Sequence, residues 1–410
     1  DHRDLHLSIR RQRQMCIRDS SKLVLRNRVV SGAIAAVLIA GIVVVWQYLQ
    51  PLDGAVQVVI TTDPVADRVV FTPYDEYLRV PHQTGQVVES KPSAITWLQP
   101  GMYRVQAFDA DGRFHEVWRQ VPAEHLGSAE DQLYPHDTWI VTGNGIVELP
   151  SFRIFRDEEV IVKTAEVKGG TFMMGFEDRT RFSATHRHLV PDMQVGINEV
   201  SYGEFRSVLG GSHYPTSSET WLSRIDGIFG DRSDVSPEMP VTGYPRDVAI
   251  LFCELAGGRL PNNAEWEYVA SQSGETVYST GDHPPEVELT DWNVIATTAE
   301  SPDDSHPQGI RNLCFSAAEF TDSANTSYRW LYPAETNVEP KNDSPTKLST
   351  LSQIQEVRGG DADWVQGGPA AGVPAAKTRV SINKVWGTDA TSRTNRGRIG
   401  WRLIRMKRTD

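Results

Sequence analysis

Three cysteines are the side chains with the widest chemical range in this 410-residue sequence. Cys16, Cys253 and Cys314 could act as nucleophiles, bind a soft metal ion or form a disulfide. Cys253 falls on the apolar side of a predicted helix, where a buried free thiol is the commoner outcome. Because disulfide connectivity cannot be deduced from sequence, a bridge between Cys253 and Cys314 stays open as the alternative.

His186 and His188 form an H-x-H pair whose side chains would share one face of a strand. Metals use this spacing, but a metal site needs three or four ligands and no third one stands nearby. Ordinary packing of the two histidines is therefore favoured. The motifs G-x-S-x-G and H-E-x-x-H and the Walker loop are absent, which leaves hydrolase and nucleotide chemistry without support.

Helix signals in the second half of the chain show which elements would position these side chains. Ser201 followed by Glu204 and Asn262 followed by Glu265 are capping boxes, and each predicts a helix start. A further helix is predicted over 248–255, where apolar residues recur at i, i+3, i+4 and i+7 and glycine follows. Elsewhere Gly, Pro, Asn and Asp are dense, so we expect long irregular loops.

Residues 53–122 are predicted to form a small all-β sandwich. Tyr103–Phe108 and Phe114–Val121 flank an Asp-Gly turn and predict a hairpin. Leu98–Val105 (LQPGMYRV) resembles the core of PEGA-type β-sandwich modules, which are often found outside a bacterial membrane anchor. We expect a spacer without a site, followed by a connector over 123–157.

Two segments further on resemble a known enzyme family. Gly257–Tyr268 (GGRLPNNAEWEY) and Gly309–Ser323 (GIRNLCFSAAEFTDS) resemble the central signatures of formylglycine-generating-enzyme, or sulfatase-modifying factor, domains. Ala165–Gly175 and Ile399–Leu403 resemble the opening and closing motifs of that family. The resemblance implies such a domain over 158–406, with an α+β fold related to C-type lectin-like domains and few regular elements.

Copper is the cofactor of the active members of this family, which oxidise a substrate cysteine with copper held by two cysteines late in the domain. The equivalent stretch here, Arg379–Arg398, contains no cysteine, and Cys253 and Cys314 lie in other signatures. Cu(I) requires thiolate or thioether ligands. Copper is therefore not expected, and the domain is predicted to be a pseudoenzyme; whether the chain is an enzyme at all stays open, with the balance against it.

Calcium is a second ion that the resemblance implies, held by oxygen ligands. Candidate ligands here are Asn293, Asp303 and Glu319, with a solvated acidic loop as the alternative. In the second signature Phe315-Ser316 replaces the usual Gly-Asn, which puts the part of the site that depends on that Asn in doubt.

Two further sets of residues follow from the matched signatures and from the predicted loops. The first set matches family positions and is expected to fix the loops through buried ion pairs and aromatic packing: Arg259, Glu265, Trp266, Arg358 and Arg402. The second set could line a binding groove, with core packing as the commoner fate of a tryptophan: Trp330, Trp364 and Trp386.

Val29–Leu49 is a stretch of 21 residues without a charge, long enough to cross ~30 Å of hydrocarbon as a helix. Basic residues precede it and acidic residues follow, so the positive-inside rule places 1–28 in the cytoplasm and everything after the span outside it. A secretory signal peptide is the alternative, but its apolar core is usually shorter. Residues 1–20 resemble translated adapter sequence, and no function is inferred from them.

The charge pattern narrows the class of partner. The net charge is −12 and no basic stripe occurs, which argues against nucleic acid. The leading hypothesis is a single-pass protein of the bacterial inner membrane whose periplasmic part binds or senses a protein, peptide or glycan. The alternatives are a cysteine-free family enzyme that carries out a periplasmic oxidation or modification, and a structural component with a large apolar interface.

Overall fold

The computed structural model describes residues 54–75, 80–82, 85–130, 132–175, 185–213, 217–276, 278–281, 306–313, 316–324, 354–358, 379–383 and 399–406. The chain divides into two compact units, Asp1–Ala55 and Val56–Asp410, and the elements below belong to the second. The predicted span at 29–49 lies outside the described residues. Within them, no helix is both long and apolar enough to cross a membrane.

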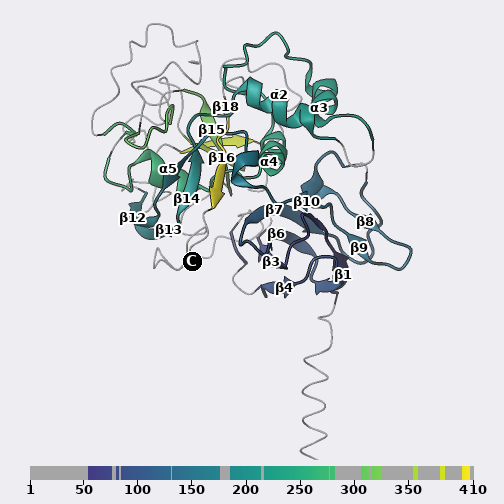
Figure 1. Cartoon of the computed structure of the whole chain (residues 1–410). Coiled ribbons are helices and arrows are strands. Elements are labelled where there is room, and N and C mark those ends of the chain that lie inside the picture. Colours follow the sequence, from purple (N-terminus) through teal and green to yellow (C-terminus); the bar gives the residue numbers. More distant parts are fainter. Residues whose placement is uncertain are drawn as a thin grey trace, which may run out of the picture. The chain divides into compact units, whose positions relative to one another are not determined.

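Two four-stranded sheets form the first part of the second unit (Figure 1). The first sheet has the order β5 (Thr96–Leu98), β1 (Val56–Val59), β9 (Val147–Glu148) and β8 (Ile140–Val141). The second has the order β4 (Val88–Ser90), β3 (Arg68–Tyr74), β6 (Gly101–Phe108) and β7 (Phe114–Val121). A short parallel pair joins β2 (Thr62–Asp63) to β10 (Phe152–Arg153).

The predicted hairpin is confirmed as β6 and β7, which pair from Gly101 opposite Val121 to Phe108 opposite Phe114. Alternation along both strands directs apolar side chains into a core shared with the first sheet. This core includes Val58, Phe71, Val105, Val117 and Val121. Strand β7 is at the edge of its sheet, yet nearly all of it is buried.

Three short strands, β8, β9 and β10, lie within the range 123–157 that was expected to be a connector. β9 pairs in parallel with β1, and β10 pairs in parallel with β2. Strands of two residues have no usable periodicity, so only the distant partner strand reveals them. The chain thus completes the β module, defined as 56–153, immediately before the second part begins.

Four α-helices are described, and two of them begin at the predicted capping boxes. Ser201 accepts a hydrogen bond from the Glu204 amide, and Asn262 accepts one from the Glu265 amide. The helices are α2 (Tyr202–Gly211), α3 (Trp221–Phe229), α4 (Arg246–Leu255) and α5 (Asn263–Ala270). Short 3-10 turns occur at η1 (Pro135–Asp137) and η2 (Asp157–Glu159).

Three sheets accompany these helices in the second part. The first has the order β11 (Thr164–Val167), β14 (Met193–Gly196) and β19 (Ile404–Met406). The second pairs β12 (Gly170–Met174) with β13 (His186–Val190). The third has the order β17 (Arg379–Asn383), β16 (Ile354–Arg358), β15 (Ala318–Ala324) and β18 (Ile399–Gly400). The described content is mixed α+β, with few helices and many strands.

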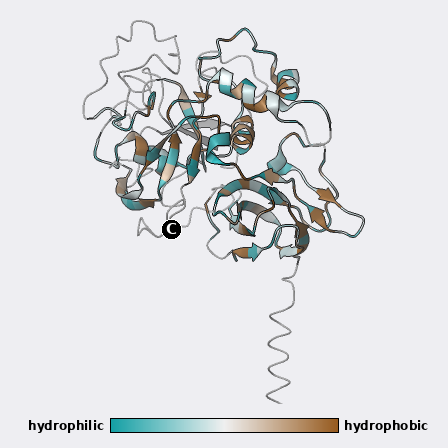
Figure 2. Ribbon diagram, in the orientation of Figure 1, coloured by the Kyte–Doolittle hydropathy of each residue, from teal (hydrophilic) through white to brown (hydrophobic). Residues whose placement is uncertain are grey.

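Helix α4 lies at the centre of the second part and is largely apolar (Figure 2). Phe252 on this helix, Phe205 on α2 and Trp401 near the C-terminal end pack with ring centroids about 6 Å apart. The Trp401 carbonyl accepts a hydrogen bond from the Val200 amide, and the Leu403 carbonyl accepts one from Gly196. Residues 399–404 are therefore part of the core of the domain.

Candidate functional site

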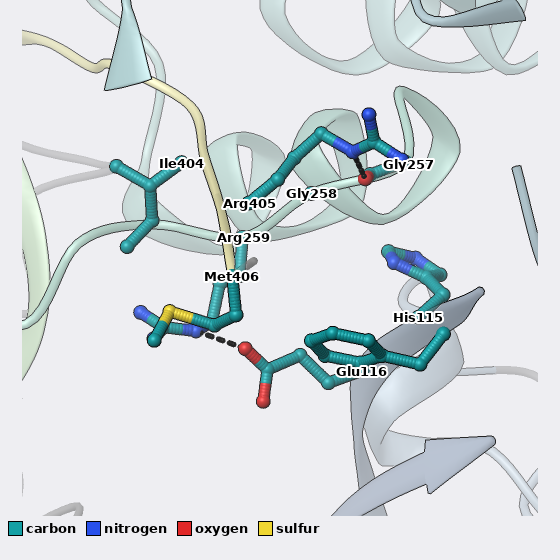
Figure 3. Close-up of a pocket in the computed structure, with 9 residues that line it drawn as sticks. His115, Glu116, Gly257, Gly258, Arg259, Ile404, Arg405 and Met406 are labelled. Atoms are coloured by element: carbon teal, nitrogen blue, oxygen red, sulfur yellow. Dashed lines mark hydrogen bonds and ion pairs between the residues drawn. The ribbon is translucent and has the colours of Figure 1, made fainter. Parts of the chain in front are cut away.

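Arg259, directly after α4, is the centre of one buried ionic cluster. Gly257 has φ +82°, which ends α4, and the next residues return so that the Arg259 and Ile404 backbones exchange two hydrogen bonds. Nη1 and Nη2 of Arg259 donate to the two carboxylate oxygens of Glu265 at 2.7 and 2.6 Å. Nε donates to Glu116 of β7. One guanidinium thus joins the Arg-Leu-Pro signature to the β module (Figure 3).

The charges in this cluster stabilise one another. Burial alone would raise the pKa of Glu116, but Arg259 and Arg104 outweigh it and lower the pKa to about 2. Burial would lower the pKa of Arg259, but Glu265 and then Glu116 raise it well above its usual range. Glu116 and Arg259 are therefore both ionised at neutral pH, and removal of either one leaves the other as a buried charge without full compensation.

Two more ion pairs join the β module to the second part. Arg119 of β7 donates to both oxygens of Glu254 on α4, at 3.0 and 2.7 Å. Arg104 of β6 donates to Asp322 of β15 at 2.8 Å, and Trp118 donates to the same carboxylate at 3.0 Å. These contacts tie β6 and β7 to α4 and β15 of the second part.

His115 belongs to the same junction. A hydrogen bond of 3.1 Å joins its Nε2 to the carbonyl of Glu254, and burial lowers the pKa of the imidazole to about 4. It lines a small cavity together with Glu116, Gly258 and Arg405 (Figure 3). The cavity has the volume of about one water molecule, so it cannot admit a substrate.

Glu319 on β15 lies in a second buried cluster. Trp266 donates to Oε2 of Glu319 at 2.7 Å, and Nη2 of Arg402 donates to Oε1 at 2.7 Å. Arg402 also donates to the carbonyls of Gly196 and Arg311, so it ties the closing motif to two other segments. Glu319 is 0% exposed and Arg402 is 1% exposed.

Glu199 lies beside this second cluster. It accepts hydrogen bonds from the Ala317 amide at 2.9 Å and from the Ser316 hydroxyl at 3.1 Å. Burial, and after it the negative charge of Glu319, raise the pKa of Glu199 to about 8. A carboxyl with such a pKa is a frequent mark of an active site. Glu199, however, is only 1% exposed, so a substrate cannot reach it, and its carboxyl group stabilises the fold by binding Ser316 and Ala317.

The residues around Glu319 do not fit a calcium ion. Both carboxylate oxygens already accept hydrogen bonds from Arg402 or Trp266, and the guanidinium charge would repel a cation. Among the described residues, no three His, Cys, Asp or Glu side chains are grouped so that they could hold a metal. The other two candidate ligands, Asn293 and Asp303, lie outside the described residues.

The two clusters contain four of the five residues expected to fix the loops: Arg259, Glu265, Trp266 and Arg402. The backbone of the fifth, Arg358, pairs with that of Glu319 between β16 and β15. The candidate groove residues lie outside the described residues: Trp330, Trp364 and Trp386. Sequence reasoning missed Glu116, whose signal was a charged residue inside a strand with apolar neighbours.

His186 and Cys253 are buried, whereas His188 is half-buried. His186 and His188 lie on β13 with ring centroids 6.0 Å apart, and His186 is 3% exposed. Cys253 is a buried free thiol in the last turn of α4, and burial raises its pKa well above the usual range. A buried thiol of this kind is chemically inert.

The fold and these clusters define an α+β domain of the formylglycine-generating-enzyme type. The family model described as "Sulfatase-modifying factor enzyme 1-like domain" matches residues 154–406, which is more than half of the chain. The chain therefore belongs to this family. No curated protein matches the chain.

Solved structures with a similar arrangement are also found. Treponema denticola variable protein 1 is 16% identical, with a TM-score of 0.38 over 60% of this chain and 95% of that one. PvdO from Pseudomonas aeruginosa is 16% identical, with a TM-score of 0.38 over 62% and 97%. CarF is 15% identical, with a TM-score of 0.35 over 61% and 100%. Likeness at this level carries no argument about function.

Proposed function

We propose that this chain is a binding or sensory module of a bacterial inner membrane. In this proposal Val29–Leu49 spans the membrane and 56–410 lies outside the cytoplasm, where a protein, peptide or glycan is bound. The acidic net charge of −12 disfavours nucleic acid as that partner.

The observation that carries the proposal is that no cysteine stands where the family's two copper ligands would be. After Cys314 the sequence contains no cysteine, so the late pair of copper ligands is missing. Cys253 is fully buried in the core and cannot take their place. Without thiolate ligands a Cu(I) oxidase centre cannot be assembled.

The ionic clusters support the same reading. Arg259, Glu319 and Arg402 are all less than 9% exposed; Arg402 is bonded directly to Glu319, and Arg259 is bonded to Glu265. A buried charged side chain whose hydrogen-bond partners all lie within the protein stabilises the fold and is not available to bind a ligand. Recognition is then left to the surface and to the loops, where Trp330, Trp364 and Trp386 are the proposed anchors.

Metal analysis and ligand arrays together test the proposal. The full chain in lipid nanodiscs is analysed by native mass spectrometry with and without chelator, and then screened on peptide and glycan arrays. We expect no stoichiometric copper, iron or zinc, and binding that is lost in Trp330→Ala, Trp364→Ala or Trp386→Ala. Trp97→Ala, at a described tryptophan that is 47% exposed, is the matched control and should bind normally.

The opposite results would support the enzyme alternative. If a transition metal resists dialysis and no ligand is found on either array, the binding-module proposal is wrong and the cysteine-free enzyme becomes the favoured hypothesis.

A further inference from the structure

One shallow cleft in the second part is large enough for a ligand. Its volume is about 400 Å³, which lies within the usual range for small-molecule sites. Three apolar and five polar residues line it, among them Val160, Ile197, Asp157, Lys163, Gln194 and Arg405. We call it the Arg405 cleft.

Strand alternation explains why this cleft has polar walls. β14 pairs with β11 and with β19, so that Gln194 and Arg405 are direct cross-strand neighbours. Their neighbours in register, Val195 and Ile404, point the other way into the core. The sheet thus has one face in the core and one face that carries the cleft.

Arg405 is held in a fixed position within the cleft. Its Nε donates to the Gly257 carbonyl at 3.0 Å, and its Nη1 donates to Asp157 at 2.9 Å and to Gln194 at 3.3 Å. Within the described part of the chain no hydrogen bond from Nη2 is found, and the Arg405 side chain, which is 12% exposed, lines the cleft. A guanidinium fixed on one side and available on the other loses little entropy when an anion binds.

The local charge is positive although the chain as a whole is acidic. Lys163 is exposed and adds a second cation to Arg405. Asp157 is the opposing charge, but its side chain is 81% exposed, so its ion pair is weak and open to replacement by another carboxylate.

We propose that the Arg405 cleft binds the carboxylate of an acidic peptide. The carboxylate lies between Arg405 and Lys163, and an adjoining aliphatic side chain covers Val160 and Ile197, which are half-buried wall residues of the cleft. This inference rests on the proposed binding function and names a ligand class and a site for it. A small organic acid has the same carboxylate chemistry, and the test separates the two sources.

The test uses the full chain in nanodiscs and two N-acetylated tripeptides, Ala-Leu-Glu and its fully amidated counterpart Ala-Leu-Gln-amide, with succinate as the small acid. Calorimetry should show binding of the acidic peptide, weaker binding of succinate and none of the amide. Lys163→Gln should weaken the binding about threefold, as expected for one exposed charge pair. Lys168→Gln, at another exposed lysine, is the matched control and should have no effect.

Asp157→Asn should change the affinity for the peptide in the direction opposite to Lys163→Gln. Because it removes the carboxylate that competes for Arg405, it should tighten peptide binding about threefold. Equal binding of the acid and the amide, or equal affinities in the Lys163 and Asp157 variants, would overturn the proposal. Tighter binding of succinate than of the peptide would leave a small-acid site instead. A different result would be peptide binding that is unchanged in Lys163→Gln and Asp157→Asn but lost in the Trp330, Trp364 or Trp386 variants. That result would refute the Arg405 cleft as the site and would still support the proposed binding function.

Discussion

The carboxylate of Glu116 on β7 accepts a hydrogen bond from Nε of Arg259, which stands 143 positions later in the chain. Both side chains are less than 9% exposed. Arg259 belongs to the Arg-Leu-Pro signature of the family domain, whereas Glu116 belongs to the β module. The two parts therefore share an ionic interior, and the β module is packed on the domain as part of one folded unit.

Glu116→Gln should destabilise the whole second unit. The substitution removes one charge from a buried pair and leaves the guanidinium partly uncompensated, which costs about 3 kcal/mol. Urea unfolding followed by circular dichroism measures the change. The control is Glu89→Gln, because Glu89 pairs with Arg68 at 3.8 Å on the surface, and its effect should stay within about 0.5 kcal/mol. Equal effects of the two substitutions would show that the buried pair does not hold the junction.

Glu199→Gln should remove a pH dependence. The folded-state pKa of Glu199 is about 8 and its ordinary value is 4.5, so the folded state binds the proton more tightly. Wild-type stability is then full below about pH 4.5 and declines up to about pH 8, by an amount on the order of a few kcal/mol. Glutamine imitates the protonated form, so the variant should be more stable than the wild type at pH 9. A wild-type curve without this decline would contradict the raised pKa.

His115 should make the junction sensitive to acid. Burial lowers its folded-state pKa to about 4 from the ordinary 6.5, so the unfolded state takes up the proton first. Stability is lost as the pH falls from about 6.5 to 4, and the loss is on the order of 3 kcal/mol. His115→Gln keeps a donor for the Glu254 carbonyl without a titrating group, and its free energy of unfolding should vary less across this window. If both proteins lose stability in parallel, His115 is not the responsible group.

Chelation distinguishes calcium ligands from scaffold residues. Because both oxygens of Glu319 are bonded to Arg402 and Trp266, Glu319→Gln should lower the melting temperature equally with and without EGTA. We expect Asn293→Ala and Asp303→Ala to abolish any shift that EGTA causes in the wild type. A shift that disappears in Glu319→Gln instead would place the ion at Glu319.

Membrane orientation is tested with spheroplasts whose inner membrane is intact. Proteinase K added to spheroplasts should digest residues 56–410 if they lie outside the cytoplasm, as the charge asymmetry around Val29–Leu49 predicts. A cytoplasmic enzyme serves as the lysis control. Protection of the chain until detergent is added would reverse the predicted orientation.

Local signals were sufficient to predict the helix starts and the hairpin. The side chains of Ser201 and Asn262 cap their helices by accepting hydrogen bonds from backbone amides three positions later. β6 and β7 meet across a tight turn. The ionic junction could not be predicted in this way. The partners of Glu116, Arg119 and Arg104 lie more than a hundred positions away, and no short-range pattern specifies which buried charge meets which.

The pairing of β1 has a mechanical consequence. β1 is the first strand of the second unit, and it is held between β5 and β9, with β9 parallel to it. A pull on the chain at Val56 would load these hydrogen bonds in shear, along the direction in which several must break together. Tension would pass from β1 through β9 and the short β2–β10 pair to residue 154, where the family domain begins. Val56 and the start of the family domain are thus joined through hydrogen-bonded strand pairs as well as through the intervening chain.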